Sequence, residues 1–123
     1  QAEIGSASSM AAAGAVYLAG GDTEAIIHAA AMAMKNLLGL ACDPVAGLVE
    51  VPCVKRNVVG AVNALSAADM ALAGGRSIIP PDEVFDAMRS VGISLPEAIR
   101  ETGKGGLAAT TTGQKIAQGL QHE

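Results

Sequence analysis

Two cysteines are the residues of this 123-residue sequence best suited to chemistry. Cys42 and Cys53 lie eleven positions apart, each close to a proline, in a segment that also carries Lys55, Arg56 and Asn57. Thiols near cationic side chains tend to have a low pKa and to bind metals as thiolates. Two thiolates alone do not complete a zinc or iron–sulfur site, because such sites have three or four protein ligands. The spacing therefore leaves two interpretations open: a metal site with further ligands, or a pair of buried structural thiols.

A glycine-rich segment, RETGKGGLA over residues 100–108, is the second candidate for chemistry. The backbone amides of Gly103, Gly105 and Gly106 could form a nest that binds an anion, with Arg100 or Lys104 as the counter-charge. The segment lacks the GxxxxGK[ST] spacing of a P-loop. The alternative is that these residues form only a flexible connection between two helices.

Helices must position both candidates, because apolar residues recur at helical spacing and no alternating β-branched run is long enough for a strand. We predict an all-α fold, an Ala-rich bundle of about five to six helices. An irregular loop over residues 40–57 should carry both cysteines, with one helical turn between its two prolines. Glycine pairs, capping residues, the Pro80-Pro81 pair and a Ser94–Glu97 capping box mark the helix ends. The expected helices span residues 3–19, 22–38, 57–73, 81–91, 94–100 and 112–120.

The composition excludes several classes of function. The net charge is -4 and aromatic residues make up 2% of the chain, so neither a nucleic acid nor an anionic membrane is an expected partner. No apolar run approaches the length of a membrane span. The first residues lack the basic and apolar regions of a signal peptide, and Gln1 is not an initiator methionine. We therefore expect a cytoplasmic chain that is one piece of a longer protein.

Three segments carry a resemblance to a known family: QAEIGSASSMAAA, NLLGLACDPVAGLVEVPCVKRN and RETGKGGLAATTTG. In order and spacing they resemble the α chain of the iron–sulfur-dependent bacterial L-serine dehydratases, along essentially the whole chain. The resemblance implies a [4Fe–4S] cluster with three cysteine ligands. Cys42 and Cys53 match two of these ligands, and the third is expected immediately before Gln1. Residues 1–123 would then be the C-terminal part of the catalytic α domain, without its upstream half and that half's APTNG motif.

The resemblance also implies a reaction, a substrate and partners. The family eliminates water from L-serine and yields pyruvate and ammonia, with an open iron acting as a Lewis acid on the hydroxyl group. Lys55, Arg56 and Asn57, beside Cys53, are the first candidates to bind the substrate carboxylate, followed by Arg100 and the glycine-rich segment. The catalytic base has no candidate.

The end of the chain, QGLQHE, lacks the terminal cysteine of single-chain relatives, and this resembles the type with a separate β chain. We expect an oligomer, exposed apolar faces where partners are missing, and no activity from this chain alone. Two alternatives remain. One is a cluster-dependent lyase that acts on threonine or cysteine, and the other is a non-catalytic helical docking domain.

Overall fold

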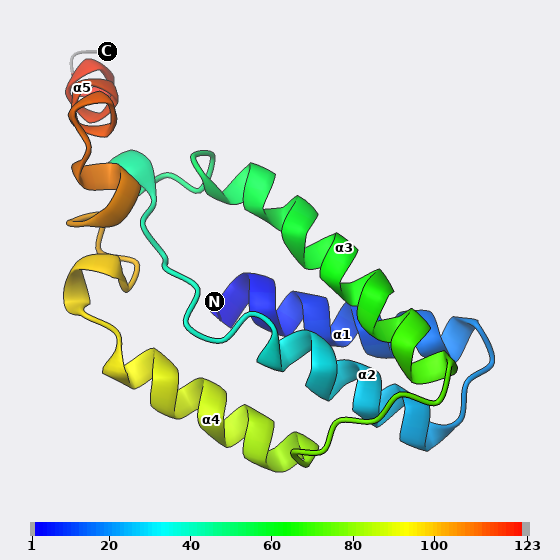
Figure 1. The fold of residues 1–123 in the computed structure, drawn as a ribbon. Helices are drawn as coiled ribbons and strands as arrows, with labels where there is room; N and C mark the ends of the chain where they lie inside the picture. The colour runs from blue at the N-terminus through cyan, green and yellow to red at the C-terminus, as the bar shows by residue number, and fades with distance from the viewer. Residues whose placement is uncertain (1, 122–123) are drawn as a thin grey trace.

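The fold is all-α, as predicted. A computed structural model describes residues 2–121 (Figure 1) and, within that range, contains five α-helices, three short 3₁₀ turns and no strand. The only extended pairing among these residues is an isolated parallel bridge between Cys42 and Arg100. No helix in the described range is both long and apolar enough to cross a bilayer. The helices are α1 (Ala2–Leu18), α2 (Thr23–Lys35), α3 (Cys53–Leu72), α4 (Pro81–Ser94) and α5 (Thr111–Leu120).

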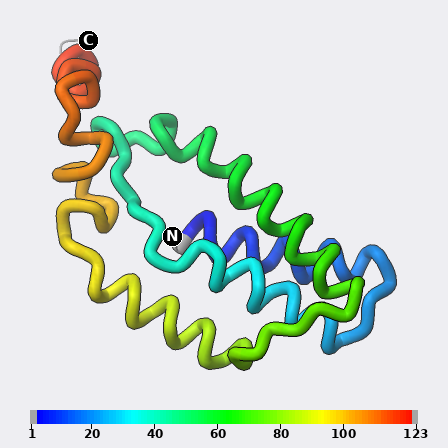
Figure 2. The backbone as a smooth tube through the Cα atoms, in the orientation of Figure 1, coloured from blue at the N-terminus to red at the C-terminus, as the bar shows by residue number. Residues whose placement is uncertain are grey.

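Helices α1, α2 and α3 pack on one another through small side chains. Because seven of the nine residues in the buried cluster between them are alanines, the helices approach closely, and a Cβ added at Gly60 of α3 would lie 2.9 Å from Ile4 of α1. Helix α4 packs on α2 through Val84, whereas α5 stands apart on the 3₁₀ turns Val45–Gly47 and Gly106–Ala109 (Figures 1 and 2). The buried cluster of the three-helix core comprises Ala12, Val16, Ala29, Met32, Ala33, Ala64, Ala67, Ala68 and Ala71.

One polar side chain joins all three core helices. The Asn63 amide nitrogen of α3 donates to the hydroxyl of Ser8 in α1 at 2.8 Å and to the carbonyl of Ala33 in α2 at 2.9 Å. Its amide oxygen accepts a hydrogen bond of 2.9 Å from Asn36. Ser8 in turn donates to the carbonyl of Gly60 at 2.7 Å. Asn63 therefore satisfies polar groups from both neighbouring helices within an otherwise apolar interface.

Replacing Asn63 with alanine should lower the free energy of unfolding by about 1–3 kcal/mol, because two acceptors (Ser8 and Ala33) and one donor (Asn36) lose their partner in a partly buried site. Chemical denaturation followed by circular dichroism would measure the change. Asn57→Ala, on the exposed side of the same helix, is the control and should change stability by less than about 0.5 kcal/mol. Equal stability of Asn63→Ala and the unsubstituted chain would contradict this role.

Three predicted helix boundaries are wrong. Helix α2 ends at Lys35, and turns lead from there to Gly39, whose φ is +81°. Helix α3 begins at Cys53 rather than Asn57, because the carbonyl of Pro52 accepts from the Arg56 amide at 3.1 Å and closes the first turn. Only Cys42 of the two cysteines therefore lies on the irregular loop. The single turn expected between the two prolines is present at Val45–Gly47.

The predicted capping box at Ser94 is the third error. Ser94 is the last residue of α4, and its hydroxyl donates backwards to the carbonyl of Val91 at 2.8 Å. Leu95 is extended, since a residue before a proline is disfavoured in the helical region. The expected helix over residues 94–100 is reduced to one 3₁₀ turn at Glu97–Ile99.

Candidate functional site

The backbone of Cys42 is fixed by the segment that precedes the glycine-rich residues. Its N–H donates to the carbonyl of Ile99 at 2.9 Å, and its carbonyl accepts from the amide of Glu101 at 2.8 Å. These two bonds form the parallel bridge to Arg100. The two candidates found in the sequence, the cysteine loop and the glycine-rich segment, are therefore neighbours in space, although about 60 residues separate them.

A buried carboxylate next to Cys42 connects a third segment. Asp43 is 3% exposed, and its carboxylate accepts from the Arg56 guanidinium at 2.5 Å and from the Leu107 amide at 2.7 Å. The same Arg56 nitrogen donates to the carbonyl of Ala41 at 2.9 Å. Arg56 lies in the first turn of α3, three residues after Cys53. The Asp43 cluster, defined as Asp43, Arg56 and Leu107, thus joins both cysteine-bearing segments to the glycine-rich one.

The Asp43 cluster also bears on the predicted anion nest. The anion bound by the glycine-rich segment is a carboxylate of the same chain: Asp43 accepts a hydrogen bond from the Leu107 amide. Burial by itself would raise the pKa of Asp43, but hydrogen bonds from Leu107 and Arg56 and the Arg56 charge outweigh it, so the pKa lies below its usual value. Lys104, a predicted counter-charge, pairs with Glu97 at 2.5 Å instead.

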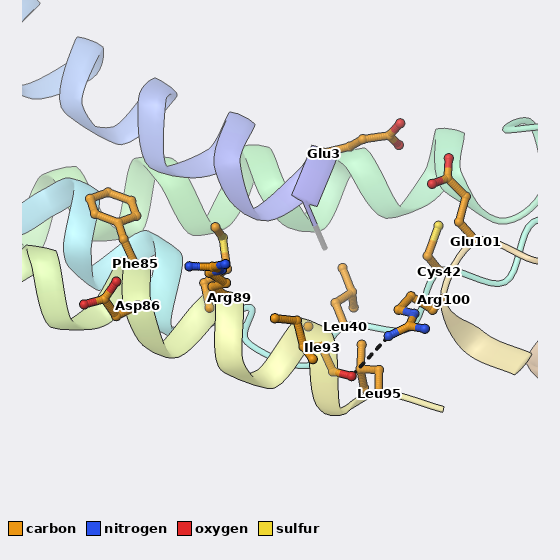
Figure 3. A pocket seen from close by; sticks show the side chains of 12 residues that line it. Glu3, Leu40, Cys42, Phe85, Asp86, Arg89, Ile93, Leu95, Arg100 and Glu101 are labelled. Carbon is orange, nitrogen blue, oxygen red and sulfur yellow. Dashed lines mark hydrogen bonds between the residues drawn. The ribbon is translucent and has the colours of Figure 1, made fainter. Parts of the chain in front are cut away.

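A cavity of about 610 Å³ opens beside Cys42, between the start of α1 and helix α4 (Figure 3). At one end Cys42 lies with Glu3, Arg100 and Glu101 (Figure 3). One guanidinium nitrogen of Arg100 donates to the carbonyl of Ile93 at 3.1 Å. The rest of the wall is largely apolar and consists mainly of Leu40, Phe85, Met88, Ile93 and Leu95, with Asp86 and Arg89 on α4. The cavity therefore combines charged groups beside a thiol with an apolar extension.

The pKa of the Cys42 thiol is raised, chiefly by burial, and the negative charges of Glu101 and Glu3 act in the same direction. The low pKa predicted from nearby cations is therefore wrong for Cys42. The reason is visible in the contacts, since Arg56 is bound to Asp43 and Lys55 is exposed.

Comparison with known proteins identifies the family. The family model described as "Serine dehydratase alpha chain" matches residues 1–108. The chain belongs to this family. Among similar proteins, the probable L-serine dehydratase α chain of Latilactobacillus sakei is 69% identical over 113 residues, which cover 92% of this chain and 54% of that protein.

Two further relatives of this serine dehydratase α-chain family have similar descriptions. The probable L-serine dehydratase α chain of Bacillus subtilis (strain 168) is 65% identical over 94% of this chain and 39% of the relative. The L-serine dehydratase α chain of Peptoniphilus asaccharolyticus is 55% identical over 100% of this chain and 42% of the relative. The chain thus spans between 39% and 54% of the length of these three family members.

The structure distributes the predicted site residues of this family member over two places. Cys42 and Arg100 share the cavity, whereas Cys53, half-buried, is the first residue of α3. Lys55 and Asn57, two and four residues after Cys53 in α3, are exposed and do not line the cavity. Sequence reasoning did not single out the buried Asp43, nor the carboxylates of Glu3 and Glu101 that lie beside Cys42 in the cavity. A charged residue between Cys42 and a proline was the one available signal for Asp43, and none existed for Glu3 or Glu101.

The type of ligand atom that this serine dehydratase α-chain segment offers, cysteine sulfur, is the type that iron–sulfur clusters bind. Both cysteines are free thiols and both are partly exposed, which suits a soft, thiolate-preferring metal. Within residues 2–121, no three or more His, Cys, Asp or Glu side chains form a group that could hold a metal ion. The described residues therefore offer two thiol ligands, and a complete site needs at least one more.

Proposed function

We propose that this chain is part of the catalytic α chain of an iron–sulfur L-serine dehydratase, a lyase that eliminates water from L-serine and yields pyruvate and ammonia. Identities of 55–69% to proteins described as L-serine dehydratase α chains support the reaction. The observation that carries the proposal is that Cys42 lies at one end of a cavity together with Arg100 and the carboxylates of Glu3 and Glu101. A thiol for a metal and charged groups for an amino acid thus lie within the same space.

Cys42 and Cys53 are the proposed cluster ligands from this chain. The third ligand would be a cysteine immediately before Gln1. That position lies outside the residues that the structure describes. Glu3, near the start of α1, lines the cavity together with Cys42, and this proximity supports a ligand from the chain that leads into α1. When bound, a [4Fe–4S] cluster with three protein ligands would supply Lewis-acid stabilisation of the leaving hydroxide.

Arg100 is the proposed anchor for the substrate carboxylate. Its guanidinium has five N–H groups, and one of its nitrogens is used by the carbonyl of Ile93. Glu3 or Glu101 would bind the substrate ammonium group at the same end of the cavity. Lys55 and Asn57, two and four residues along α3 from Cys53, remain second candidates for the carboxylate.

The remainder of the α chain and a β chain are the proposed partners. A cavity of about 610 Å³ is of a size that suits a drug-sized ligand, so a three-carbon amino acid would fill only part of it. We expect the upstream half of the α chain or the β chain to close the rest. Exposed apolar residues of α3 (Val54, Val58, Val62 and Leu65) would contact these partners. An oligomer in the cytoplasm, where thiols stay reduced, completes the proposal.

The test is reconstitution of the complete α and β chains with iron and sulfide in the absence of oxygen. The enzyme should develop broad visible absorption and convert L-serine to pyruvate faster than it converts L-threonine or L-cysteine, and residues 1–123 alone should show no turnover. Faster turnover of L-cysteine or L-threonine would favour a related lyase. If the reconstituted protein shows no visible absorption and no turnover, the result would favour a non-catalytic docking domain.

A further inference from the structure

We propose that Asp43 is a positioning residue that sets the two cysteine-bearing segments relative to each other. This inference rests on the proposed function, in which Cys42 and Cys53 are ligands of one cluster. It assigns a purpose to a buried charged side chain that neither contributes a ligand nor lines the cavity beside Cys42.

The contacts of Asp43 reach each segment that must be aligned. Its own backbone follows Cys42 directly, so the carboxylate is fixed to that ligand's peptide unit. One oxygen accepts from Arg56 of α3 at 2.5 Å, and the other accepts from the Leu107 amide at 2.7 Å. Because the carboxylate is nearly fully buried, these bonds have little competition from water.

Arg56 transmits this alignment to Cys53. Residues three positions apart on a helix lie on the same face, so Arg56 and Cys53 project to the same side of the first turn of α3. The N-cap position of α3 is Pro52, and no side chain caps this end of the helix. By contrast, Asp22 caps α2 and Thr110 caps α5. The bond between Arg56 and Asp43 therefore fixes the rotation of the first turn of α3 about the helix axis.

A second contact of Arg56 makes the alignment specific. The same guanidinium nitrogen donates to Asp43 and to the carbonyl of Ala41, so it bonds to residues on both sides of Cys42. Two points of the loop, on either side of Cys42, are thus held to one point of the helix. Groups that orient metal ligands from outside the coordination shell typically change metal affinity by 10–100-fold when they are removed.

The test compares Asp43→Asn with the unsubstituted complete enzyme after anaerobic reconstitution. The amide keeps the shape but removes the charge that binds Arg56. We expect iron to pass to a chelator at least roughly tenfold faster, with an altered visible circular dichroism of the cluster. Arg56→Lys, which keeps the charge but loses the planar guanidinium, should lie between the two.

Val16→Ala is the matched control, because it removes buried volume at the far end of α1 and lowers thermal stability without touching the Asp43 cluster. It should leave the rate of iron release unchanged. Unchanged iron release in Asp43→Asn would overturn the inference, and so would equal acceleration in Val16→Ala. If Asp43→Asn does not fold, Arg56→Lys decides by the same criterion. Failure of the unsubstituted enzyme to take up iron would instead refute the proposed function, and with it this inference.

Discussion

Serine in place of Cys42 or Cys53 should remove the iron–sulfur absorption and the turnover of L-serine together. A serine hydroxyl is a harder ligand than a thiol and does not ionise at neutral pH, so it does not replace a thiolate on iron. Loss of several kcal/mol of Lewis-acid stabilisation, about 4 kcal/mol, corresponds to a rate roughly a thousandfold lower. Iron content, visible absorption and the rate of pyruvate formation would be measured on the complete enzyme.

The fold should survive both changes, because neither cysteine belongs to the buried cluster of the three-helix core. Far-ultraviolet circular dichroism should therefore match that of the unsubstituted protein. Ala41→Ser is the control, since it adds a hydroxyl beside Cys42 and removes no sulfur. Normal activity in either cysteine variant would contradict the ligand assignment and would favour a docking domain with incidental thiols.

Replacing Gly106 with alanine should be among the most destabilising single changes in the chain. Gly106 has a φ of +58°, and an added Cβ would lie 2.3 Å from one carboxylate oxygen of Asp43 and 2.7 Å from its Cβ. The left-handed conformation alone costs a residue with a Cβ about 1–2 kcal/mol. Displacing a buried, hydrogen-bonded carboxylate adds a similar or larger amount. A total of about 3 kcal/mol would lower the melting midpoint by about 10 °C.

Gly119→Ala is the appropriate comparison for this prediction. Gly119 lies within α5, and an added Cβ there would meet nothing within 4 Å. Since alanine is the better helix former by up to about 1 kcal/mol, this variant should melt at the same temperature or slightly higher. Similar midpoints for the two variants would show that the contact between Gly106 and Asp43 is unimportant. Differential scanning calorimetry of both would decide.

Local signals in the sequence were sufficient for most of the helical framework. The Asp22 cap is formed by a hydrogen bond of 2.8 Å from the Ala25 amide, and the Pro80-Pro81 pair starts α4 as expected. The start of α3 was misplaced because Asn57 fits a capping pattern, whereas the carbonyl of Pro52 closes the first turn. Patterns of single residues do not show which of two adjacent start signals the tertiary structure uses.

The candidate site was harder to predict from the sequence than the fold. The thiols and Arg100 stand out by residue type, but the bond between Asp43 and Leu107 joins positions 64 residues apart. Lys55, Arg56 and Asn57 were grouped because they are consecutive, yet the helix turns Arg56 towards Asp43 while Lys55 and Asn57 face outward. Contacts of this kind depend on how distant segments pack, and no local pattern in a single sequence predicts them.

In the alanine-rich interface between α1 and α3, Asn63 also selects one register of the two helices. Alanine side chains form shallow ridges, so arrangements in which one helix has slid along its neighbour by a turn, about 5.4 Å, would bury similar apolar surface. The hydrogen bonds from Asn63 of α3 to Ser8 of α1, and from Ser8 to the carbonyl of Gly60 in α3, exist in one such register only. Because Glu3 lies at the start of α1 and lines the same cavity as Cys42, that register fixes how far the start of α1 lies from the thiol. Asn63 and Ser8, both within the bundle, thereby set the spacing at its open end.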